Sequence, residues 1–297
     1  MSLQLRHSFL LFVTAAIWGT GFVAQALGMV HISPFAYTWG RSAIGCVFLL
    51  VLMPFLDRLR GIRPKPGEPN LWKNKSLWIG GTACGLMLFI SESLQQFGLL
   101  YTEVVPVISA LRGRSCAFTL WLAVLLAVVG MWFLSVKEGG FSLSLGDTLV
   151  LLCAVSFSLH ILVIDHFAPQ GDGVRMSCIQ FAVGSVVGGV CMMFFDPPSL
   201  QDLMAAMLCL LYSGCLSNGV AYTLQIVAQK GMNPTVASLI MSLESAVGAV
   251  AGWLILGQVL TGREILGCVI MAAAIVLAQI PESWLKISRK THRSSLQ

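Results

Sequence analysis

Long apolar runs occupy most of this chain and leave little room for a soluble fold. Of the 297 residues, 57% are hydrophobic and only 10% are charged, whereas soluble domains contain about 25% charged residues. A helix of about 20 apolar residues crosses the hydrocarbon core of a bilayer, and a helix satisfies its own backbone hydrogen bonds there. The chain is therefore predicted to be an all-α, polytopic membrane protein.

Nine of these runs are predicted to form full transmembrane helices. They cover residues 9–30, 35–56, 78–99, 118–136, 145–164, 174–195, 205–227, 235–257 and 263–280. The first run is longer than the roughly 7 to 15 apolar residues of a signal peptide, and no small-residue cleavage site follows it. We therefore expect it to remain as the first span.

Two groups of basic residues predict how the helices are oriented. They follow the second run and the last run: Arg58, Arg60, Arg63, Lys65, Lys73 and Lys75, then Lys286, Arg289, Lys290 and Arg293. Loops rich in Lys and Arg stay in the cytoplasm, so both termini are predicted to be cytoplasmic, in the cell inner (plasma) membrane. This positive charge is concentrated beside the helices and does not form an extended basic surface of the kind that binds nucleic acid. We therefore expect membrane lipid, and not nucleic acid, to surround the protein.

The second half of the chain repeats the helical order of the first. Residues 94–95, near the end of the third run, match residues 224–225, near the end of the eighth, and Trp18 aligns with Phe157. We interpret the chain as two five-helix repeats, at 1–136 and 137–297. Because five is an odd number, the two repeats insert in opposite senses, which is the inverted arrangement of secondary transporters with a substrate site near the midplane.

The two repeats differ in length at one helix. Residues 94–95 match the second repeat at an offset of 130, whereas residues 119–123 align with 263–267 at an offset of 144. The first repeat is therefore 14 residues shorter, which leaves 103–111 as its fourth span. Nine residues of helix reach only about 14 Å, so this stub is predicted to be completed by extended backbone, or else the deletion damages the protein.

In this order and spacing, several motifs resemble the EamA family of the drug/metabolite transporter superfamily. They are residues 16–23 (Ala-Ile-Trp-Gly-Thr-Gly-Phe-Val), Arg41, residues 98–102 (Gly-Leu-Leu-Tyr-Thr), 141–147, 160–165 and 242–244. The resemblance implies ten spans in two repeats and a secondary transporter, with export the favoured direction. It also implies a full fourth helix that lines the central cavity, and this chain departs from that pattern.

Three functional hypotheses follow. The first is a secondary transporter that moves a small metabolite, amino acid or drug-like solute by alternating access, with proton coupling. The second is an integral membrane enzyme, and the third is a relative that has lost transport with its fourth helix. The sequence lacks a Walker loop and the H-E-x-x-H and G-x-S-x-G motifs, and its nine cysteines are scattered singly, so no enzyme, cofactor or metal site is predicted.

Ionisable residues inside the spans are the first candidates for function, because a charge at the bilayer centre costs several kcal/mol. Glu92 lies in the third span and Glu244 near the middle of the ninth. Either carboxyl can bind and release protons during transport, or it can hold helices together by hydrogen bonds.

Basic side chains within the spans form the second set of candidates. Arg41 can pair with a carboxylate, reach the outer interface or bind an anionic group of the solute. His160 stands five residues before Asp165 and can relay protons with it, or it can cap the helix end. For Arg41, the favoured interpretation is a structural ion pair with a carboxylate. For His160, the favoured interpretation is that it caps the helix end.

Polar residues at membrane depth must face one another or a cavity. Asn218, Tyr222 and Gln225 share one helical face, as do Glu92 and Gln95, and the two helices are repeat partners. These faces are predicted to be two walls of one cavity, against the alternative that they only bond helices together. The candidate cavity residues are Trp18, Gln25, Glu92, Gln95, Asn218, Tyr222, Gln225 and Glu244.

Overall fold

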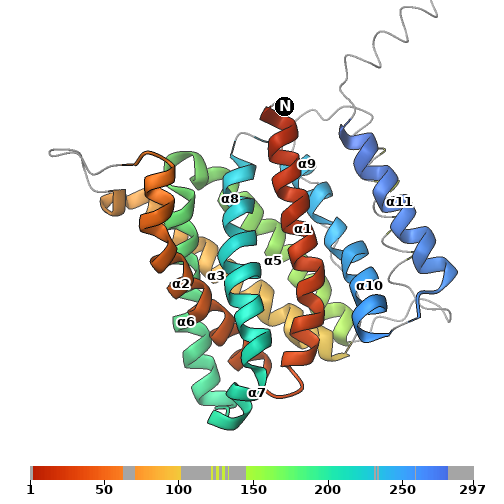
Figure 1. Ribbon diagram of the computed structural model, residues 1–297, viewed down its shortest axis with the longest axis horizontal. Coiled ribbons are helices and arrows are strands. Elements are labelled where there is room, and N and C mark those ends of the chain that lie inside the picture. Colours follow the sequence, from red (N-terminus) through yellow and green to blue (C-terminus); the bar gives the residue numbers. More distant parts are fainter. Residues whose placement is uncertain are drawn as a thin grey trace, which may run out of the picture.

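The computed structural model describes residues 3–62, 71–101, 145–230, 232, 234–257 and 259–279, together with 122, 125–126, 129–130 and 133. These residues form helices and connecting turns and contain no strand (Figure 1). The predicted stub 103–111, most of span 118–136 and the C-terminal basic group lie outside the described residues.

The helices run up and down past one another. Those of the first half are α1 (Leu3–Gly28), α2 (Pro34–Leu59), the short η1 (Leu71–Lys73) and α3 (Lys75–Tyr101). Those of the second half are α5 (Leu145–Phe167), η2 (Ala168–Gln170), α6 (Gly173–Phe195), α7 (Leu200–Leu211), η3 (Tyr212–Tyr222), α8 (Thr223–Gln229), α9 (Pro234–Met241), α10 (Leu243–Leu256) and α11 (Gly262–Gln279).

Seven helical stretches among the described residues are long and apolar enough to cross a membrane. They are Leu5–Gly28, Pro34–Leu59, Lys75–Phe97, Leu152–Gln170, Gly173–Phe195, Leu200–Gln229 and Val236–Leu256. The prediction of an all-helical, multi-pass membrane protein is confirmed. The full count of nine is not, because 263–280 forms α11 without being one of the seven, and 118–136 is largely undescribed.

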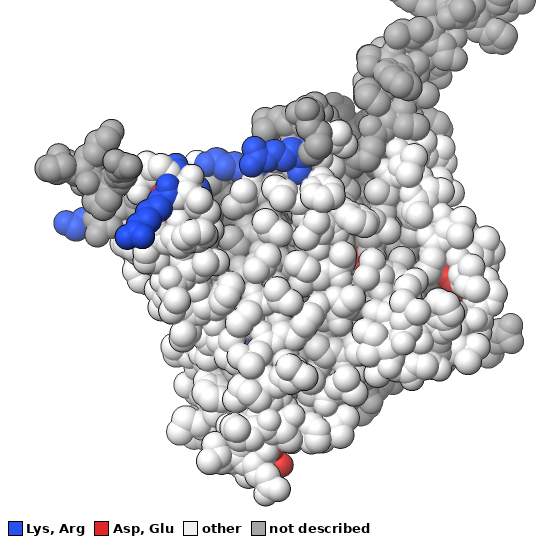
Figure 2. Space-filling model, viewed as in Figure 1, with Lys and Arg blue, Asp and Glu red and all other residues white. Residues whose placement is uncertain are grey.

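The outside of the bundle is apolar, and its basic side chains gather at one end. Large side chains such as Val51, Val186 and Phe194 are exposed on the helices, where lipid would contact them. Lys and Arg lie along one edge of the face shown in Figure 2. We call this the basic end; it carries Arg58, Arg60, Lys73 and Lys75, and Figure 1 places the N-terminus there as well.

Two of the spans are less regular than their sequences predict. The span predicted at 205–227 extends from Leu200 to Gln229, and its middle section, η3, is π-helical. The span predicted at 235–257 is interrupted at Ser242, which separates α9 from α10. Wide turns and interruptions change which side chains share a face, and both irregular sections border the site described below.

Four charged residues tie α2 to α6 at the basic end. Arg60 bonds Asp172 (Nη1 to Oδ2, 2.6 Å) and Asp57 (Nη2 to Oδ1, 2.8 Å). Arg175 bonds Asp57 (Nη2 to Oδ2, 2.5 Å) and lies 3.3 Å from Asp172, which also caps the first turn of α6. We call this closed group the ionic ring; as a network it joins the two halves of the chain more firmly than isolated surface pairs do.

Close packing of α1 against α10 depends on Gly19. A Cβ atom built on Gly19 would lie 2.6 Å from the backbone oxygen of Glu244 and 2.6 Å from Cβ of Val247. The same atom built on Gly21 would find its nearest neighbour, in Tyr212, at 3.9 Å. One glycine is therefore required by backbone contact, while the other has room for a methyl group.

This difference predicts opposite effects of two conservative substitutions. Gly19→Ala should destabilise the protein by about 1–3 kcal/mol, because α10 must move away from α1. Gly21→Ala, the matched control, should be neutral or slightly stabilising, since alanine is the better helix former. Thermal unfolding of the purified proteins in detergent measures both, and equal melting temperatures would contradict this packing.

Candidate functional site

A cavity of about 90 Å³ lies inside the bundle, lined by residues from both halves of the chain. Six of the eight predicted cavity residues line it: Trp18, Gln25, Gln95, Tyr222, Gln225 and Glu244. The other lining residues are Phe22, Arg41, Ala154, Phe157, Ser158, Ile161, Ser217, Ser238, Met241 and Ser242. The two predicted walls, α3 and α8, thus border the same space.

An aromatic pair forms one side of the cavity. The rings of Trp18 and Tyr222 have centroids 4.6 Å apart and are tilted by 54°, a separation typical of favourable aromatic contacts. The indole Nε1 of Trp18 donates to the backbone oxygen of Ser217 at 3.4 Å. Trp18 therefore packs helices together and also presents a ring face to the cavity.

Arg41 reaches the cavity from α2 and is held by several polar groups. Its Nη2 donates to Oδ1 of Asn218 at 2.7 Å and to Oγ of Ser217 at 3.0 Å, and its Nε also donates to Asn218 at 3.1 Å. The side chain is only 2% exposed, so it does not reach the outer interface. Its charge is held at membrane depth.

Glu92 on α3 balances this charge. Its Oε1 lies 3.4 Å from Nη2 of Arg41, and the carboxyl is 1% exposed. No hydrogen-bond donor among the described residues bonds to either oxygen of this carboxyl. Glu92 and Asn218 therefore lie behind the cavity wall, where they position Arg41 and do not themselves line the space.

Asn218 and Tyr222 do not act as one face, although both are on the predicted helix. Asn218 contacts Arg41, whereas Tyr222 and Gln225 border the cavity. The cause is local, because η3 is π-helical and its residues turn by a smaller angle at each step than in an α-helix. Spacing rules for the α-helix therefore place these side chains incorrectly.

Glu244 is the acidic group that borders the cavity directly. It stands in the first turn of α10, immediately after the interruption at Ser242, and a helix N-terminus favours negative charge. Among the described residues, no Lys or Arg forms an ion pair with it. The cavity thus presents a cation already paired with Glu92 and a carboxyl that has no cationic partner among the described residues.

His160 is buried within α5 and bonds to another helix, whereas the favoured expectation was that it caps the helix end. Its Nε2 lies 3.2 Å from Oε1 of Gln180, and its ring contacts the ring of Tyr222 edge on, with centroids 6.0 Å apart. Asp165 is half-buried on the same helix. His160 therefore neither caps the helix end nor faces the headgroups, and it joins α5 to α6 and η3.

Two amide oxygens remain available for a polar solute. Oε1 of Gln25 and Oε1 of Gln225 are buried, and no donor among the described residues bonds to them. A buried acceptor without a donor costs about 1–3 kcal/mol, so a solute that donates hydrogen bonds here gains affinity. Both side chains line the cavity.

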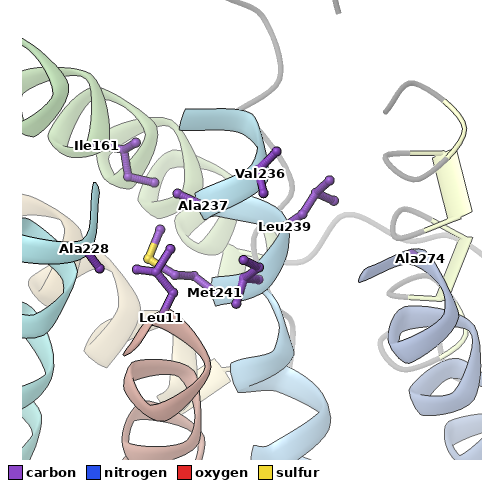
Figure 3. Packing of buried hydrophobic residues seen from close by; sticks show 9 residues of the cluster. Leu11, Ile161, Ala228, Val236, Ala237, Leu239, Met241 and Ala274 are labelled. Atoms are coloured by element: carbon purple, nitrogen blue, oxygen red, sulfur yellow. The ribbon is translucent and has the colours of Figure 1, made fainter. Parts of the chain in front are cut away.

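An apolar cluster separates the cavity from the basic end. Ile161 and Met241 line the cavity and also belong to this cluster, which includes Leu11, Ala228 and Ala237 (Figure 3). Leu11 lies in the part of α1 nearer its start, and Ala228 and Ala237 flank the turn between α8 and α9. We call this cluster the inner barrier, because its residues lie on the side of the cavity nearer the basic end.

Several lining residues were not among the sequence candidates. Phe157 carried a signal, because it aligns with Trp18 in the repeat, and both line the cavity. Ser242 belongs to the motif 242–244 but was not singled out as a cavity residue, and Ser217 carried no signal, since serine is common in membrane helices. Arg41 was expected to be paired, and it both pairs with Glu92 and lines the cavity.

A multi-pass helical bundle with a polar, charged cavity between its halves defines a class of membrane transport protein. Comparison with known families agrees, since residues 144–279 match the EamA-like transporter family. The second half of the chain therefore contains an EamA-like segment, and the relatives of the whole chain carry the names of transporters, not of enzymes.

Two relatives with transporter names match across nearly the whole chain, and a third matches about half of it. An uncharacterized transporter of Archaeoglobus fulgidus is 27% identical over 90% of this chain and 84% of its own length. The uncharacterized transporter YdfC of Bacillus subtilis is 22% identical over 97% of this chain and 93% of its own length. The threonine/homoserine exporter RhtA of Salmonella typhimurium is 30% identical, over 51% of this chain and 52% of its own length.

The fold also has a counterpart among solved structures. One crystal structure aligns with a TM-score of 0.70 at 15% identity, covering 93% of this chain and 98% of the other. At this identity the likeness concerns the fold alone.

The Arg41 and Glu92 pair predicts a non-additive mutant cycle. Arg41→Gln leaves the Glu92 carboxyl buried without its cation, which should cost about 3–5 kcal/mol of stability. Adding Glu92→Gln removes the uncompensated charge and should restore most of that loss. Thermal unfolding of the two single variants and the double variant measures the coupling. Additive losses would contradict a direct buried pair.

Proposed function

We propose that the protein is a secondary transporter that binds its solute in the central cavity and moves it by alternating access. The observation that carries this proposal is the cavity itself, which places Arg41, Glu244 and two unsatisfied glutamine oxygens at membrane depth. Polar and charged groups in that position are expensive, and in membrane proteins they mark solute pathways.

The proposal includes the inverted repeat predicted from the sequence. If the halves are related by a two-fold axis in the membrane plane, α2 corresponds to α6, and α3 to the helix formed by η3 and α8. The packing supports this correspondence, in which α1 also corresponds to α5. The helices α2 and α6 pack on each other, as a symmetric pair should. The contact of α3 with α6 has its counterpart in the contact of η3 with α2, and the contact of α3 with α5 has its counterpart in the contacts of η3 and α8 with α1. A site between two such halves is accessible from one side at a time.

The proposed solute is a small zwitterion such as an amino acid. Arg41 can bind a carboxylate at the cavity wall, and Glu244 can bind an ammonium group. The similarity to the threonine/homoserine exporter RhtA over half the chain supports this class and supports export as the direction. Proton coupling through Glu244 is part of the same proposal, since its carboxyl has no cationic partner among the described residues.

Alternating access requires the cavity to widen and the basic end to open. The described cavity of about 90 Å³ is well below the roughly 300–1,000 Å³ of typical ligand pockets. Opening toward the basic end would separate the inner barrier and strain or break the ionic ring between α2 and α6. We therefore infer that these two contacts hold the protein closed on that side.

One rival hypothesis remains testable beside this one. The shortened fourth span predicted at 103–111 can leave a relative that folds without transporting, and the described residues do not include that segment. A transporter and an inactive relative differ in flux through purified protein.

The test is transport by purified protein in liposomes, with Glu244→Gln as the variant and Glu264→Gln as the matched control. Glu264 caps the start of α11 through Thr261 and does not line the cavity. Glutamine cannot exchange a proton, so Glu244→Gln should reduce amino-acid flux driven by a pH gradient about tenfold or more, within the range that coupling energies produce. Counterflow of the same amino acid should continue, and Glu264→Gln should behave as wild type.

The other outcomes separate the parts of the proposal. Loss of both gradient-driven flux and counterflow would assign Glu244 to solute binding in place of coupling. Unchanged flux in Glu244→Gln would contradict both roles. No flux of any amino acid through the wild-type protein, with recovery after inserting the missing 14 residues of the first repeat behind Thr102, would support the inactive relative.

A further inference from the structure

A second, wholly apolar hollow lies on the outside of the bundle. It has a volume of about 390 Å³ and is lined by residues of α2, η1, α3 and α6: Cys46, Leu50, Trp72, Trp78, Cys178, Ile179, Ala182, Val183, Val186 and Val187. Val186, Leu50 and Trp78 are 68%, 49% and 51% exposed. The hollow, which we call the outer groove, therefore faces the lipid and is separate from the central cavity.

The length and depth of the outer groove match one leaflet of a bilayer. Its α6 residues run from Cys178 to Val187, which spans about 14 Å along a helix. Half of a hydrocarbon core of about 30 Å is about 15 Å. The groove begins about one turn inside the start of α6, so it lies in the leaflet at the basic end. An acyl chain of that leaflet fits its length and chemistry.

Two tryptophans form the end of the groove nearest the basic end. The rings of Trp72 and Trp78 have centroids 6.3 Å apart, and Nε1 of Trp78 donates to the backbone oxygen of Trp72 at 2.7 Å. Tryptophan favours the level of the lipid headgroups. The pair therefore marks where the acyl region ends and the headgroup begins.

Two lysines stand beyond this pair, at the level of the headgroup. Lys73 follows Trp72 directly, and Lys75 precedes Trp78 by three residues, so it lies on the same face of α3. Both are exposed, and no acidic residue among those described pairs with either. Lys75 also begins α3, where the helix dipole disfavours a cation and favours an anion beside it. A lipid phosphate would neutralise the charge of these two lysines. The arginines of the ionic ring need no such anion, because the two aspartates of the ring already neutralise them.

We propose that the outer groove is a binding site for an anionic phospholipid, with one acyl chain between α2 and α6 and the phosphate at Lys73 and Lys75. A second copy of this chain is a poorer occupant, because it would bring the same lysines toward these lysines. The site is independent of the solute that the central cavity carries.

Native mass spectrometry of the full-length protein in detergent tests this proposal. The protein is mixed with equal concentrations of phosphatidylglycerol and phosphatidylcholine that have identical acyl chains. We expect one phosphatidylglycerol to be retained preferentially. Each of Lys73→Gln and Lys75→Gln should lower that preference about fivefold, the contribution of one basic residue at an anionic lipid surface. Lys230→Gln, an exposed cation at the end of α8 outside the groove, is the matched control and should change nothing.

A groove-filling variant tests the acyl-chain half of the site. Ala182→Phe should abolish retention of either lipid, because the larger side chain fills the groove. If this variant does not fold, the lysine variants still test the proposed site. Equal retention of the two lipids, or a preference for phosphatidylglycerol that survives both lysine substitutions, would overturn the proposal. A protein dimer without bound lipid would overturn it in favour of a second copy of the chain.

Discussion

A charged side chain cannot remain alone inside a bilayer, and the arrangement around Arg41 follows from that constraint. The guanidinium is 2% exposed and finds its partners on two other helices, Glu92 on α3 and Ser217 and Asn218 on η3. Isolated charges at this depth are unstable, so these helices must meet where Arg41 stands. The meeting point of α2, α3 and η3 is also the wall of the central cavity.

The same helix, α2, carries the contacts at the basic end. There it is joined to α6 through the ionic ring, and the outer groove lies between the same two helices. A movement that separates α2 from α6 would therefore change the ring, the groove and the position of Arg41 together. Lipid in the groove and solute in the cavity can therefore both shift the position of α2. If lipid binding changes the affinity for the solute in this way, solute binding must change the affinity for the lipid by the same factor.

The length of the apolar runs predicted the helices well, because whether a helix is stable in lipid depends mainly on its length and composition. Six of the eight candidate cavity residues line one space in the structure, since polar side chains such as Gln25 and Gln225 stand out in apolar sequence; their role in solute binding stays a prediction. The π-helical turn of η3 and the interruption at Ser242 were missed, because neither contains a proline and both depend on tertiary packing. Because of the π-helical turn, Asn218 was grouped with Tyr222. The bond between His160 and Gln180 joins two different helices, and spacing along one helix cannot predict such a partner.

The central claim is that the cavity between the two halves is where the solute binds. A structure of the protein in a lipid nanodisc, determined with a saturating concentration of the amino acid that gives the highest flux, tests it most directly. We expect the solute between Arg41 and Glu244, with its carboxylate toward the guanidinium and its side chain against Trp18 and Tyr222. Solute bound outside this cavity, with the cavity itself unchanged from its volume of about 90 Å³, would contradict the account.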